Sequence, residues 1–497
     1  MCAMPRTPLS YRAAWVASLA AACALSAPAV LAAAPTATGP TACRLRGVEH
    51  EALCGSVVRP LDPQQPQGVQ IAVHYAVLPA LARNKRPDPV FFFAGGPGQS
   101  AIEIAPQVAT MLARFGNRRD IVLVDQRGTG RSAPLLCDAD DPALPLAELF
   151  SLQRQRERIA QCLLKLKALP HGDLRFFTTT LAMQDAEAVR AALGAERINA
   201  VGGSYGTRAV LEYQRQFPAR VRRSVIDGVA PPDMVLPTSF STDSQAALDA
   251  LFAACEVEVA CNRHEPQLRE RWRALLASLP RNVELRHPLT DRSERLALTR
   301  DVLLGLVRGP LYAPALGAAL PAAIGQATRG RFEALAGLAQ ALGGRRGPQL
   351  AAGMHFSVVG AEVFPHVDRS ADQPGRDFGD SFASLYRDVC AGWPRGDVPA
   401  AFYALPPAPA ATLVLSGGLD PVTPPRHGER AAQALGAKAR HVVVANAGHG
   451  VMALGCMRDV LFRFVDAASD DEALKVDVAC ATGIPRPPMF ALPGAAR

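Results

Sequence analysis

One serine in this chain has the local setting of a catalytic nucleophile. Ser204 is the centre of a Gly-x-Ser-x-Gly pattern, Gly202-Gly203-Ser204-Tyr205-Gly206, which follows a short apolar run and precedes a helical pattern. Flanking glycines permit a sharp strand-to-helix turn that lifts a serine hydroxyl into an exposed position. We therefore expect Ser204 to attack a carbonyl carbon; the alternative is an ordinary turn serine.

Such a serine needs a base, and the base needs an acid that orients it. Asp420 follows one apolar run, in the polar turn Ser416–Pro424, and His449 follows the next, in Ala447–Gly450. Taken singly, Asp420 is explained as a turn former and His449 as a surface residue. Because all three residues follow predicted strands, whose carboxyl ends gather functional loops at one edge of a parallel sheet, we expect a triad of Ser204, Asp420 and His449.

Acyl transfer also needs donors for the negative charge that develops on the carbonyl oxygen. The run Ala94-Gly95-Gly96-Pro97-Gly98 follows another apolar stretch, and its glycines let a backbone amide approach a substrate. We expect the oxyanion hole to consist of the amides of Gly96 and Tyr205, with Gly95 as the substitute. The alternative is a tight connection that binds no ligand. The phosphate-loop pattern GxxxxGK[ST] is missing.

Short, continuous apolar runs predict buried strands of a parallel sheet. They are Pro89–Phe93, Ile121–Val124, Ile198–Val201, Ser224–Ile226, Thr412–Leu415 and His441–Val444, and Gln70–Val77 is predicted as a further strand. Helical patterns at Ala182–Leu193 and Thr207–Phe217 separate some of these runs. The predicted class is therefore α/β, with a mostly parallel sheet and helices on both faces.

About 185 residues separate Asp227 from Thr412, far more than one crossover connection needs. Within them, Ala and Leu recur at helical spacing at Gln245–Ala254, Leu268–Leu276, Thr299–Leu306 and Phe332–Leu342. We interpret this stretch as a helical cap that roofs a pocket; the alternative is an independent helical domain without contact to a site. The predicted division is a signal peptide at 1–32, the core at 33–229, the cap at 230–408 and the rest of the core at 409–497.

The amino-terminal residues have the layout of a secretory signal peptide. Arg6 and Arg12 precede an apolar stretch over 13–27, and a run of small residues follows. We expect a secreted or periplasmic protein; a second reading makes Cys23 a lipid-attachment site. No later segment reaches about 18 apolar residues, so we expect no transmembrane helix.

An oxidising compartment makes disulfides the expected state of the remaining nine cysteines. Four of their pairs are close in the sequence: Cys43/Cys54, Cys137/Cys162, Cys255/Cys261 and Cys456/Cys480, with Cys390 left over. Local bridges are the simplest hypothesis, although the sequence leaves the connectivity open. No CxxC or paired-His spacing is present, so we expect no metal site and no cofactor.

Composition argues against other classes of protein. The 497 residues are 49% hydrophobic and 20% charged, as in a globular chain. The net charge of +8 could favour nucleic acid, but no basic stretch is interleaved with aromatic residues, so we expect no nucleic-acid partner. The oligomeric state is left open.

Several motifs together resemble the proline iminopeptidase and tripeptidyl aminopeptidase group of α/β-hydrolases. They are Gly95–Gly98, Asp125-Gln126-Arg127-Gly128-Thr129-Gly130-Arg131-Ser132, Gly202–Gly206 and the loops of Asp420 and His449. The resemblance runs from about residue 43 to about 490 and implies an α/β-hydrolase fold, a TAP-like carboxyl-terminal segment and a metal-free serine exopeptidase. Two departures stand out: Ala94 replaces the histidine of the family's HGGPG, and Gly360 stands where relatives often have a cysteine.

Glu362 is the expected amine-binding residue. It is an acid among apolar residues in Phe356–Phe364, and its position resembles the family's amine-binding glutamate. The alternative is a structural salt bridge.

The predicted function is thus a secreted serine aminopeptidase whose substrates are peptides with a free amino terminus. An esterase or lipase with the same triad, and a non-catalytic binding protein of the same fold, are the alternatives. The preferred residue and the length of the released fragment are left open.

Overall fold

The computed structural model of the chain describes residues 36–342 and 349–490, which belong to one compact unit. The predicted signal peptide and Cys23 lie outside the described residues. Within the described ranges, every helix is too short or too polar to cross a membrane.

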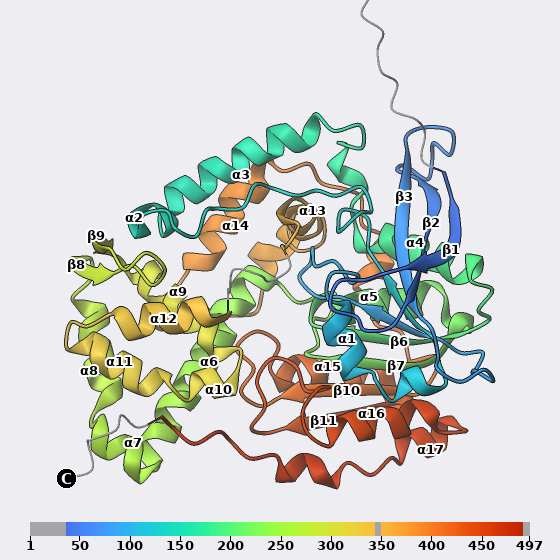
Figure 1. The fold of residues 1–497 in the computed structure, drawn as a ribbon. Coiled ribbons are helices and arrows are strands. Elements are labelled where there is room, and N and C mark those ends of the chain that lie inside the picture. The colour runs from blue at the N-terminus through green and yellow to red at the C-terminus, as the bar shows by residue number, and fades with distance from the viewer. Residues whose placement is uncertain (1–35, 343–348, 491–497) are drawn as a thin grey trace, which may run out of the picture. The chain divides into compact units, whose positions relative to one another are not determined.

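The described chain contains a nine-stranded sheet, which lies on the right in Figure 1. In spatial order, its strands are β1 (Thr38–Cys43), β2 (Ala52–Pro60), β3 (Gln70–Leu78), β5 (Ile121–Val124), β4 (Val90–Phe93), β6 (Ile198–Gly203), β7 (Val221–Asp227), β10 (Thr412–Gly417) and β11 (Ala439–Val444). Neighbours from β1 to β5 pair antiparallel, and all neighbours from β5 to β11 pair parallel. The predicted mostly parallel sheet is confirmed.

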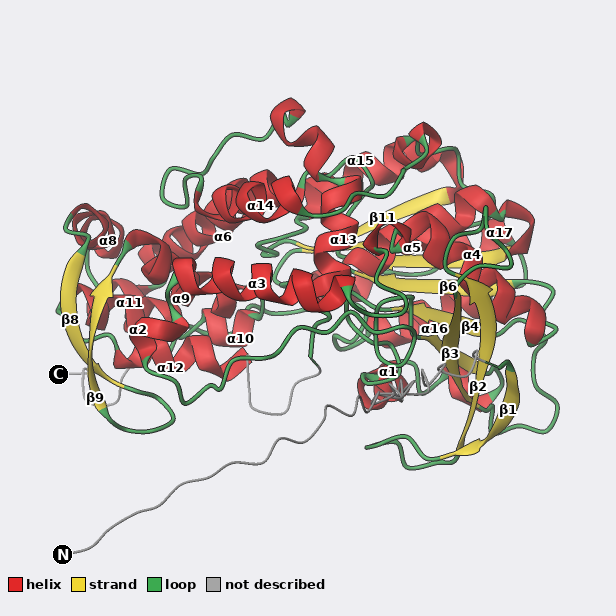
Figure 2. Ribbon diagram, turned by 90° about the horizontal axis from the view of Figure 1, so that it is seen from above, coloured by secondary structure: helices red, strands yellow, loops and turns green. Residues whose placement is uncertain are grey.

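Helices cover both faces of this sheet (Figure 2). On β4, Phe91 and Phe93 pack in the core that contains the inner sides of α4, α5 and α15. Val90 and Phe92 point to the opposite face and pack with α1, α16 and α17. Because both faces are covered, β4 and β5 are apolar throughout rather than alternating. These helices are α1 (Ala105–Met111), α4 (Thr179–Ala192), α5 (Tyr205–Gln216), α15 (Pro425–Leu435), α16 (Met457–Asp466) and α17 (Asp470–Leu474).

A large helical insertion lies between β7 and β10, as predicted. Its helices are α6 (Leu236–Val257), α7 (Val259–His264), α8 (Leu268–Ala277), α9 (Arg300–Leu311), α10 (Pro314–Gly317), α11 (Leu320–Thr328), α12 (Glu333–Leu342), α13 (Ala352–Glu362) and α14 (Ser381–Gly392). Leu248, Trp272 and Leu303 belong to a separate hydrophobic core within it. Both views show α8, α9, α11 and α12 together beside the sheet (Figures 1 and 2). The domain limits at 230 and 408 stay predictions.

Three parts of the fold differ from the sequence expectation. The insertion contains a hairpin, β8 (Arg281–Arg286) with β9 (Ser293–Leu298), in addition to helices. Strands β1 and β2 precede the first predicted strand. Between β5 and α4, helices α2 (Leu146–Leu149) and α3 (Leu152–Lys167) join the insertion: Leu146 packs in its core and donates its amide to Glu294 Oε2 at 2.6 Å.

The four expected disulfides are present. They link Cys43 to Cys54, Cys137 to Cys162, Cys255 to Cys261 and Cys456 to Cys480. Among the described cysteines, Cys390 is the free one; it is buried, and burial raises the pKa of its thiol to about 12. Four bridges in one chain fit an oxidising compartment.

Candidate active site

Ser204 occupies the turn between β6 and α5. Its φ of 56° and ψ of −126° are a strained combination for a residue with a side chain. Close backbone contacts explain its glycine neighbours: a Cβ on Gly202 would lie 2.3 Å from the Gly206 carbonyl oxygen, and one on Gly206 would lie 2.0 Å from the Phe93 carbonyl oxygen. The tight turn therefore requires the Gly-x-Ser-x-Gly pattern.

The sheet register brings the three predicted catalytic residues to one edge. Gly203, the last residue of β6, pairs with Asp227, the last residue of β7, and Ser204 follows directly. The final residues of β10 and β11, Gly417 and Val444, also pair with each other. The loops that carry Asp420 and His449 consequently start side by side.

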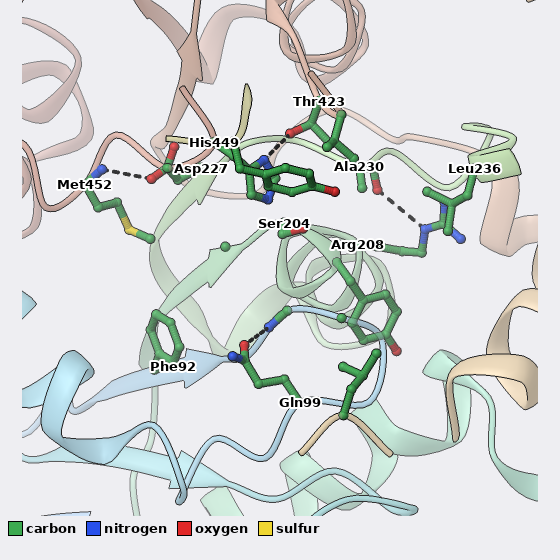
Figure 3. Close-up of a pocket in the computed structure, with 18 of the residues that line it drawn as sticks. Phe92, Gln99, Ser204, Arg208, Asp227, Ala230, Leu236, Thr423, His449 and Met452 are labelled. Carbon is green, nitrogen blue, oxygen red and sulfur yellow. Dashed lines mark hydrogen bonds between the residues drawn. The ribbon is translucent and has the colours of Figure 1, made fainter. Parts of the chain in front are cut away.

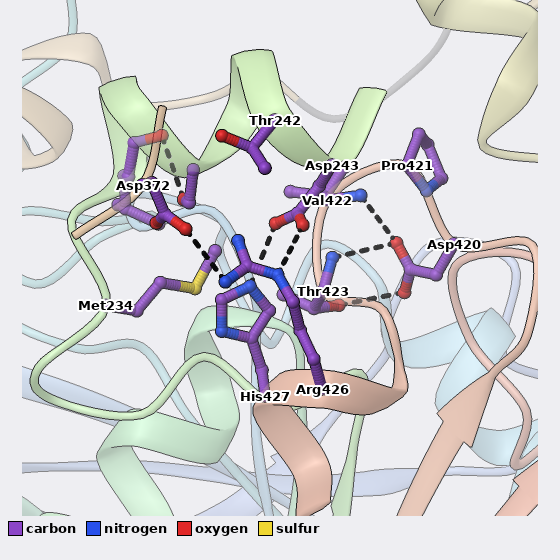
Figure 4. Close-up of polar contacts among 12 residues, drawn as sticks. Met234, Thr242, Asp243, Asp372, Asp420, Pro421, Val422, Thr423, Arg426 and His427 are labelled. Carbon is purple, nitrogen blue, oxygen red and sulfur yellow. Dashed lines mark hydrogen bonds and ion pairs between the residues drawn. The ribbon is translucent and has the colours of Figure 1, made fainter. Parts of the chain in front are cut away.

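Asp420 and His449 are bonded directly. The distance between Asp420 Oδ2 and His449 Nδ1 is 2.8 Å. Asp420 also accepts the amides of Val422 at 2.8 Å and Thr423 at 2.9 Å, and the Thr423 hydroxyl at 2.8 Å (Figure 4). Since the carboxylate is buried, these donors replace its hydration. The acid is thus fixed before any substrate binds.

The electrostatics of this pair favour an ionised acid and a basic imidazole. Burial raises the pKa of Asp420, but the charge of His449 and the hydrogen bonds outweigh it, so the pKa falls below its ordinary value. Burial lowers the pKa of His449, whereas the charge and hydrogen bond of Asp420 raise it to a greater extent, so its net shift is upward. The imidazole therefore takes up a proton readily.

Ser204 and His449 line the same cavity, which has a volume of about 540 Å³ (Figure 3). Among the described contacts, the Ser204 hydroxyl makes no hydrogen bond, and its amide donates to the Asp227 carbonyl at 2.8 Å. Catalytic hydrogen bonds of this kind often form only with substrate bound. The cavity thus contains a serine hydroxyl that is available for reaction.

The predicted oxyanion donors lie beside the serine. Gly95 and Gly96 line the cavity, and a Cβ on Gly95 would lie 3.4 Å from Ser204 Cβ. The Gly95 amide donates to Gln99 Oε1 at 3.2 Å. Within the described chain, no hydrogen bond uses the amides of Gly96 and Tyr205. Of the three nominated amides, those two are available to an oxyanion.

The motif at 125–132 supports the site from behind. Asp125 is buried and accepts the Ser100 hydroxyl at 2.6 Å and the Ile102 amide at 3.1 Å, which fixes the segment after the glycine turn. Arg127 binds both carboxylate oxygens of Asp185 at 2.7 and 2.8 Å. These contacts give the motif a structural role in holding β5 and the glycine turn together.

Glu362 lies outside the cavity lining. It is 1% exposed, and it accepts the Thr179 amide at 2.7 Å and the Thr179 hydroxyl at 3.0 Å. Its Oε2 forms an ion pair with Arg208 Nη1 at 3.5 Å. This arrangement matches the alternative of a structural salt bridge, and the amine-binding role stays a prediction.

The insertion supplies part of the cavity wall, as predicted for a cap. Leu236, Phe240, Tyr312 and Leu350 all line it. Tyr312 also accepts the His449 amide with its carbonyl oxygen at 2.9 Å, and the two rings meet edge to face at 5.3 Å between centroids. His449 is therefore held partly by the insertion.

Sequence reasoning missed Asp227, the last residue of β7, which lines the cavity. Its Oδ2 accepts the amides of Val451 at 2.6 Å and Met452 at 2.8 Å, just after His449. Its Oδ1 is buried without a hydrogen-bond partner in the described structure. Burial raises its pKa to about 6. The sequence signal for Asp227 was its position at the end of a predicted strand. Many acids at strand ends have no catalytic or binding function, so this position alone did not single it out.

Comparison with known proteins gives two family matches. The alpha/beta hydrolase fold family matches residues 88–257, and the TAP-like protein family matches residues 375–480. The second match begins within the stretch predicted as cap.

The curated relatives of this chain include proteins named as a serine protease, a carboxylesterase and an aminopeptidase. Serine protease Hip1 of Mycobacterium tuberculosis is 26% identical over 410 residues, which cover 76% of this chain and 78% of that protein. Carboxylesterase B, also of Mycobacterium tuberculosis, is 30% identical over 428 residues, 78% of each chain. A tripeptidyl aminopeptidase of Streptomyces coelicolor is 32% identical over 197 residues, 36% of this chain and 35% of that protein.

Proposed function

Since the chain belongs to the α/β-hydrolase family and carries a TAP-like carboxyl-terminal region, we propose that it is a serine aminopeptidase that cleaves peptides near free amino termini. The observation that carries this proposal is the 2.8 Å bond between Asp420 and His449 at the cavity that Ser204 lines. Two relatives named as a serine protease and a tripeptidyl aminopeptidase favour a peptide bond as the target.

In the proposed mechanism, Ser204 Oγ attacks the carbonyl carbon while His449 Nε2 takes the hydroxyl proton. Asp420 holds the proton on Nδ1 and stabilises the imidazolium. The amides of Gly96 and Tyr205 donate to the oxyanion of the tetrahedral intermediate. His449 then gives its proton to the leaving amine, which leaves an acyl-enzyme on Ser204. Water then attacks the ester carbonyl while His449 takes a proton from it, and His449 gives that proton to Ser204 Oγ as the ester bond breaks.

Replacing Ser204 by Ala tests the mechanism. We expect kcat on an aminoacyl or peptidyl arylamide to fall by about 10⁶-fold, as when a triad nucleophile is removed elsewhere. A fluorophosphonate should label the native chain, and labelling should disappear in the variant. Arylamide turnover at an unchanged rate in Ser204→Ala would contradict the proposal.

An esterase with the same triad is the second candidate, favoured by the likeness to carboxylesterase B. Matched arylamides and aryl esters, each with a free and a blocked amino group, separate the two functions. An aminopeptidase should hydrolyse the free arylamide far faster than the blocked one. An esterase should prefer the esters and be indifferent to blocking.

We also propose that the protein acts outside the cytoplasm, in the periplasm or secreted. The four disulfides support this location, because such bonds persist in oxidising compartments. Cell fractionation with an antibody, together with thiol alkylation before reduction, tests it. Recovery in the cytoplasmic fraction with reduced thiols would contradict the location and leave the catalytic proposal untouched.

A further inference from the structure

The glycine turn that carries the Gly96 amide is held by the insertion. Gly96 is exposed and lines the cavity, whereas the next two residues, Pro97 and Gly98, are buried. The Gly98 carbonyl accepts the amide of Ala351, the residue before α13, at 2.9 Å. A Cβ on Gly98 would lie 2.7 Å from the Ala351 carbonyl oxygen. The start of α13 therefore lies directly against the turn.

His355 holds the other buried carbonyl of the turn. It lies one helical turn after Ala351, to whose carbonyl its own amide donates at 2.9 Å. Its Nδ1 is 3.2 Å from the Pro97 carbonyl oxygen, and its Nε2 is 2.8 Å from the hydroxyl of Tyr386 on α14. The rings of His355 and Tyr386 also pack together, with 5.7 Å between their centroids. The imidazole thus bridges the glycine turn and α14.

The partners of His355 determine which of its nitrogens carries the proton. A carbonyl oxygen only accepts, so Nδ1 carries the hydrogen and donates to Pro97. Nε2 of the neutral ring then has a free lone pair, and the Tyr386 hydroxyl donates to it. Burial lowers the pKa of His355 to about 4 and raises the pKa of Tyr386, so at neutral pH the imidazole is neutral and the hydroxyl keeps its proton. The bond to Pro97 therefore has one fixed direction.

The Gly96 amide depends on these contacts for its orientation. Gly96 has a φ of 110° and no side chain, so its residue type restrains its backbone weakly. Peptide units are planar, so the bonds to the Pro97 and Gly98 oxygens fix the two peptide planes that follow it. Before it, the Gly95 amide donates to Gln99 Oε1 at 3.2 Å, and the Gly95 carbonyl accepts the Gln99 amide at 3.3 Å. The turn is thus fixed on both sides of Gly96.

We propose that His355 is a positioning residue for the oxyanion hole: through its bond to the Pro97 carbonyl, it holds the Gly96 amide in the direction that the oxyanion needs. This inference rests on the proposed hydrolase function. Donors for a developing oxyanion act by being in place before the reaction, and the loss of one lowers kcat by about 10²- to 10³-fold. A donor that is misdirected but still present should cost less, about 10- to 100-fold.

His355→Asn and His355→Gln test the two bonds of the imidazole separately. The amide nitrogen of asparagine lies about where Nδ1 lies, and that of glutamine about where Nε2 lies, so Asn keeps the donor to Pro97 and Gln keeps a partner for Tyr386. On the arylamide of Ala-Ala-Ala, we expect kcat to fall by about 10- to 100-fold in His355→Gln and to stay within about threefold in His355→Asn. KM should change by less than about twofold, because the donor acts mainly on charge that develops in the transition state. An equal loss in both variants, or a change in KM alone, would overturn the proposal.

Affinity for the peptide aldehyde Ala-Ala-Ala-H reports on the oxyanion hole without turnover. Ser204 Oγ adds to the aldehyde carbon, and its proton passes to His449. The carbon–oxygen double bond becomes a single bond, and its oxygen becomes an oxyanion at the amides of Gly96 and Tyr205. We expect the inhibition constant to rise in His355→Gln by the factor by which kcat/KM falls, about 10- to 100-fold. An unchanged inhibition constant beside a reduced kcat would contradict the role of His355.

Tyr403→Phe is the matched control on the same helix. It removes a 2.8 Å bond from a tyrosine hydroxyl to the Glu362 carbonyl at the other end of α13 and leaves the glycine turn untouched. We expect its kcat and its aldehyde affinity to stay within about twofold of the native values. If this variant reproduced the losses of His355→Gln, general loosening of α13 would explain both, and the inference would fail.

Tyr386→Phe keeps the proposal testable if neither His355 variant folds. It removes the donor to Nε2, so the proton of the imidazole is no longer confined to Nδ1. We expect kcat and aldehyde affinity to fall together by about 3- to 10-fold. Unchanged values for both would overturn the proposal.

Failure of the inference and failure of the proposed function give different results. Without the hydrolase function, the native chain would show no arylamide turnover and no fluorophosphonate labelling that Ser204→Ala abolishes. Failure of the inference alone would appear as turnover that depends on Ser204 and is the same in His355→Gln as in the native chain.

Discussion

Replacing Asp227 by Asn should stabilise the protein at neutral pH and have little effect in acid. The carboxyl is buried, and its pKa rises from an ordinary 3.8 to about 6 because burial disfavours the charged form. Asn keeps an oxygen that accepts the amides of Val451 and Met452, and it carries no charge. The variant therefore retains the contacts and removes the buried charge.

The expected size follows from the difference in pKa. At about 1.36 kcal/mol per pKa unit, a rise from 3.8 to about 6 corresponds to about 3 kcal/mol. Below pH 3.8, Asp227 is protonated in both the folded and the unfolded chain. Between pH 3.8 and 6 the unfolded chain releases this proton and the folded chain keeps it, so stability is lost. Above pH 6 the loss is complete.

The assay is urea unfolding of both chains from pH 3.5 to 8 without reductant, followed by intrinsic fluorescence. The unfolding free energy of Asp227→Asn minus that of the native chain should increase by about 3 kcal/mol between pH 3.5 and 7. Asp420→Asn is the matched control with the opposite sign. The pKa of Asp420 is lowered, so its contribution is present above pH 3.8 and is lost as pH falls through its folded pKa. An Asp227→Asn difference that is constant with pH would refute the reasoning.

Three further predictions concern the same edge of the sheet. Because the pKa of His449 is raised, steady-state kcat/KM of the native chain should increase with pH along a limb centred above 6.5. Asp420→Asn should move this limb to lower pH and reduce kcat by about 10⁴-fold. Thr423→Val removes the 2.8 Å hydroxyl bond to Asp420, so kcat should fall about 10- to 100-fold with the circular dichroism spectrum unchanged, and Thr423→Ser should restore it. Asp243→Asn weakens a buried 2.8 Å contact with His427, which lies on the helix after the Asp420 loop (Figure 4). The unfolding free energy, measured in urea, should fall by about 1.5–3 kcal/mol. An unchanged urea midpoint of unfolding would contradict this prediction.

The positions of the catalytic candidates could be predicted because Ser204 and Asp420 follow strands that are buried on both faces, β6 and β10, and His449 follows the neighbouring strand β11. Such strands appear in the sequence as continuous apolar runs, and parallel strands end at a common edge. Ser204 carries an additional local signal, since its tight turn demands glycine on both sides. The four disulfides agree with the simplest pairing of near neighbours, although spacing alone left the connectivity open.

Contacts between distant segments could not be predicted. In the sequence, Glu362 is an isolated acid in an apolar helix, and only the tertiary fold brings the end of α13 to Arg208 of α5 and Thr179 of α4. Asp227 looks like any acid at a strand end until its partners, Val451 and Met452, are seen. The β8–β9 hairpin is a different case: Val283 and Leu285 alternate with exposed residues, and this period of two was available as a strand signal.

The bond between the His449 amide and the Tyr312 carbonyl limits how the protein can be engineered. Trimming the insertion to obtain a minimal hydrolase scaffold would leave this amide without its acceptor and remove the ring that packs against the imidazole. A shortened design would have to graft a replacement carbonyl at the same point. The insertion is, in that sense, part of what holds His449 in place and not an accessory that can be discarded.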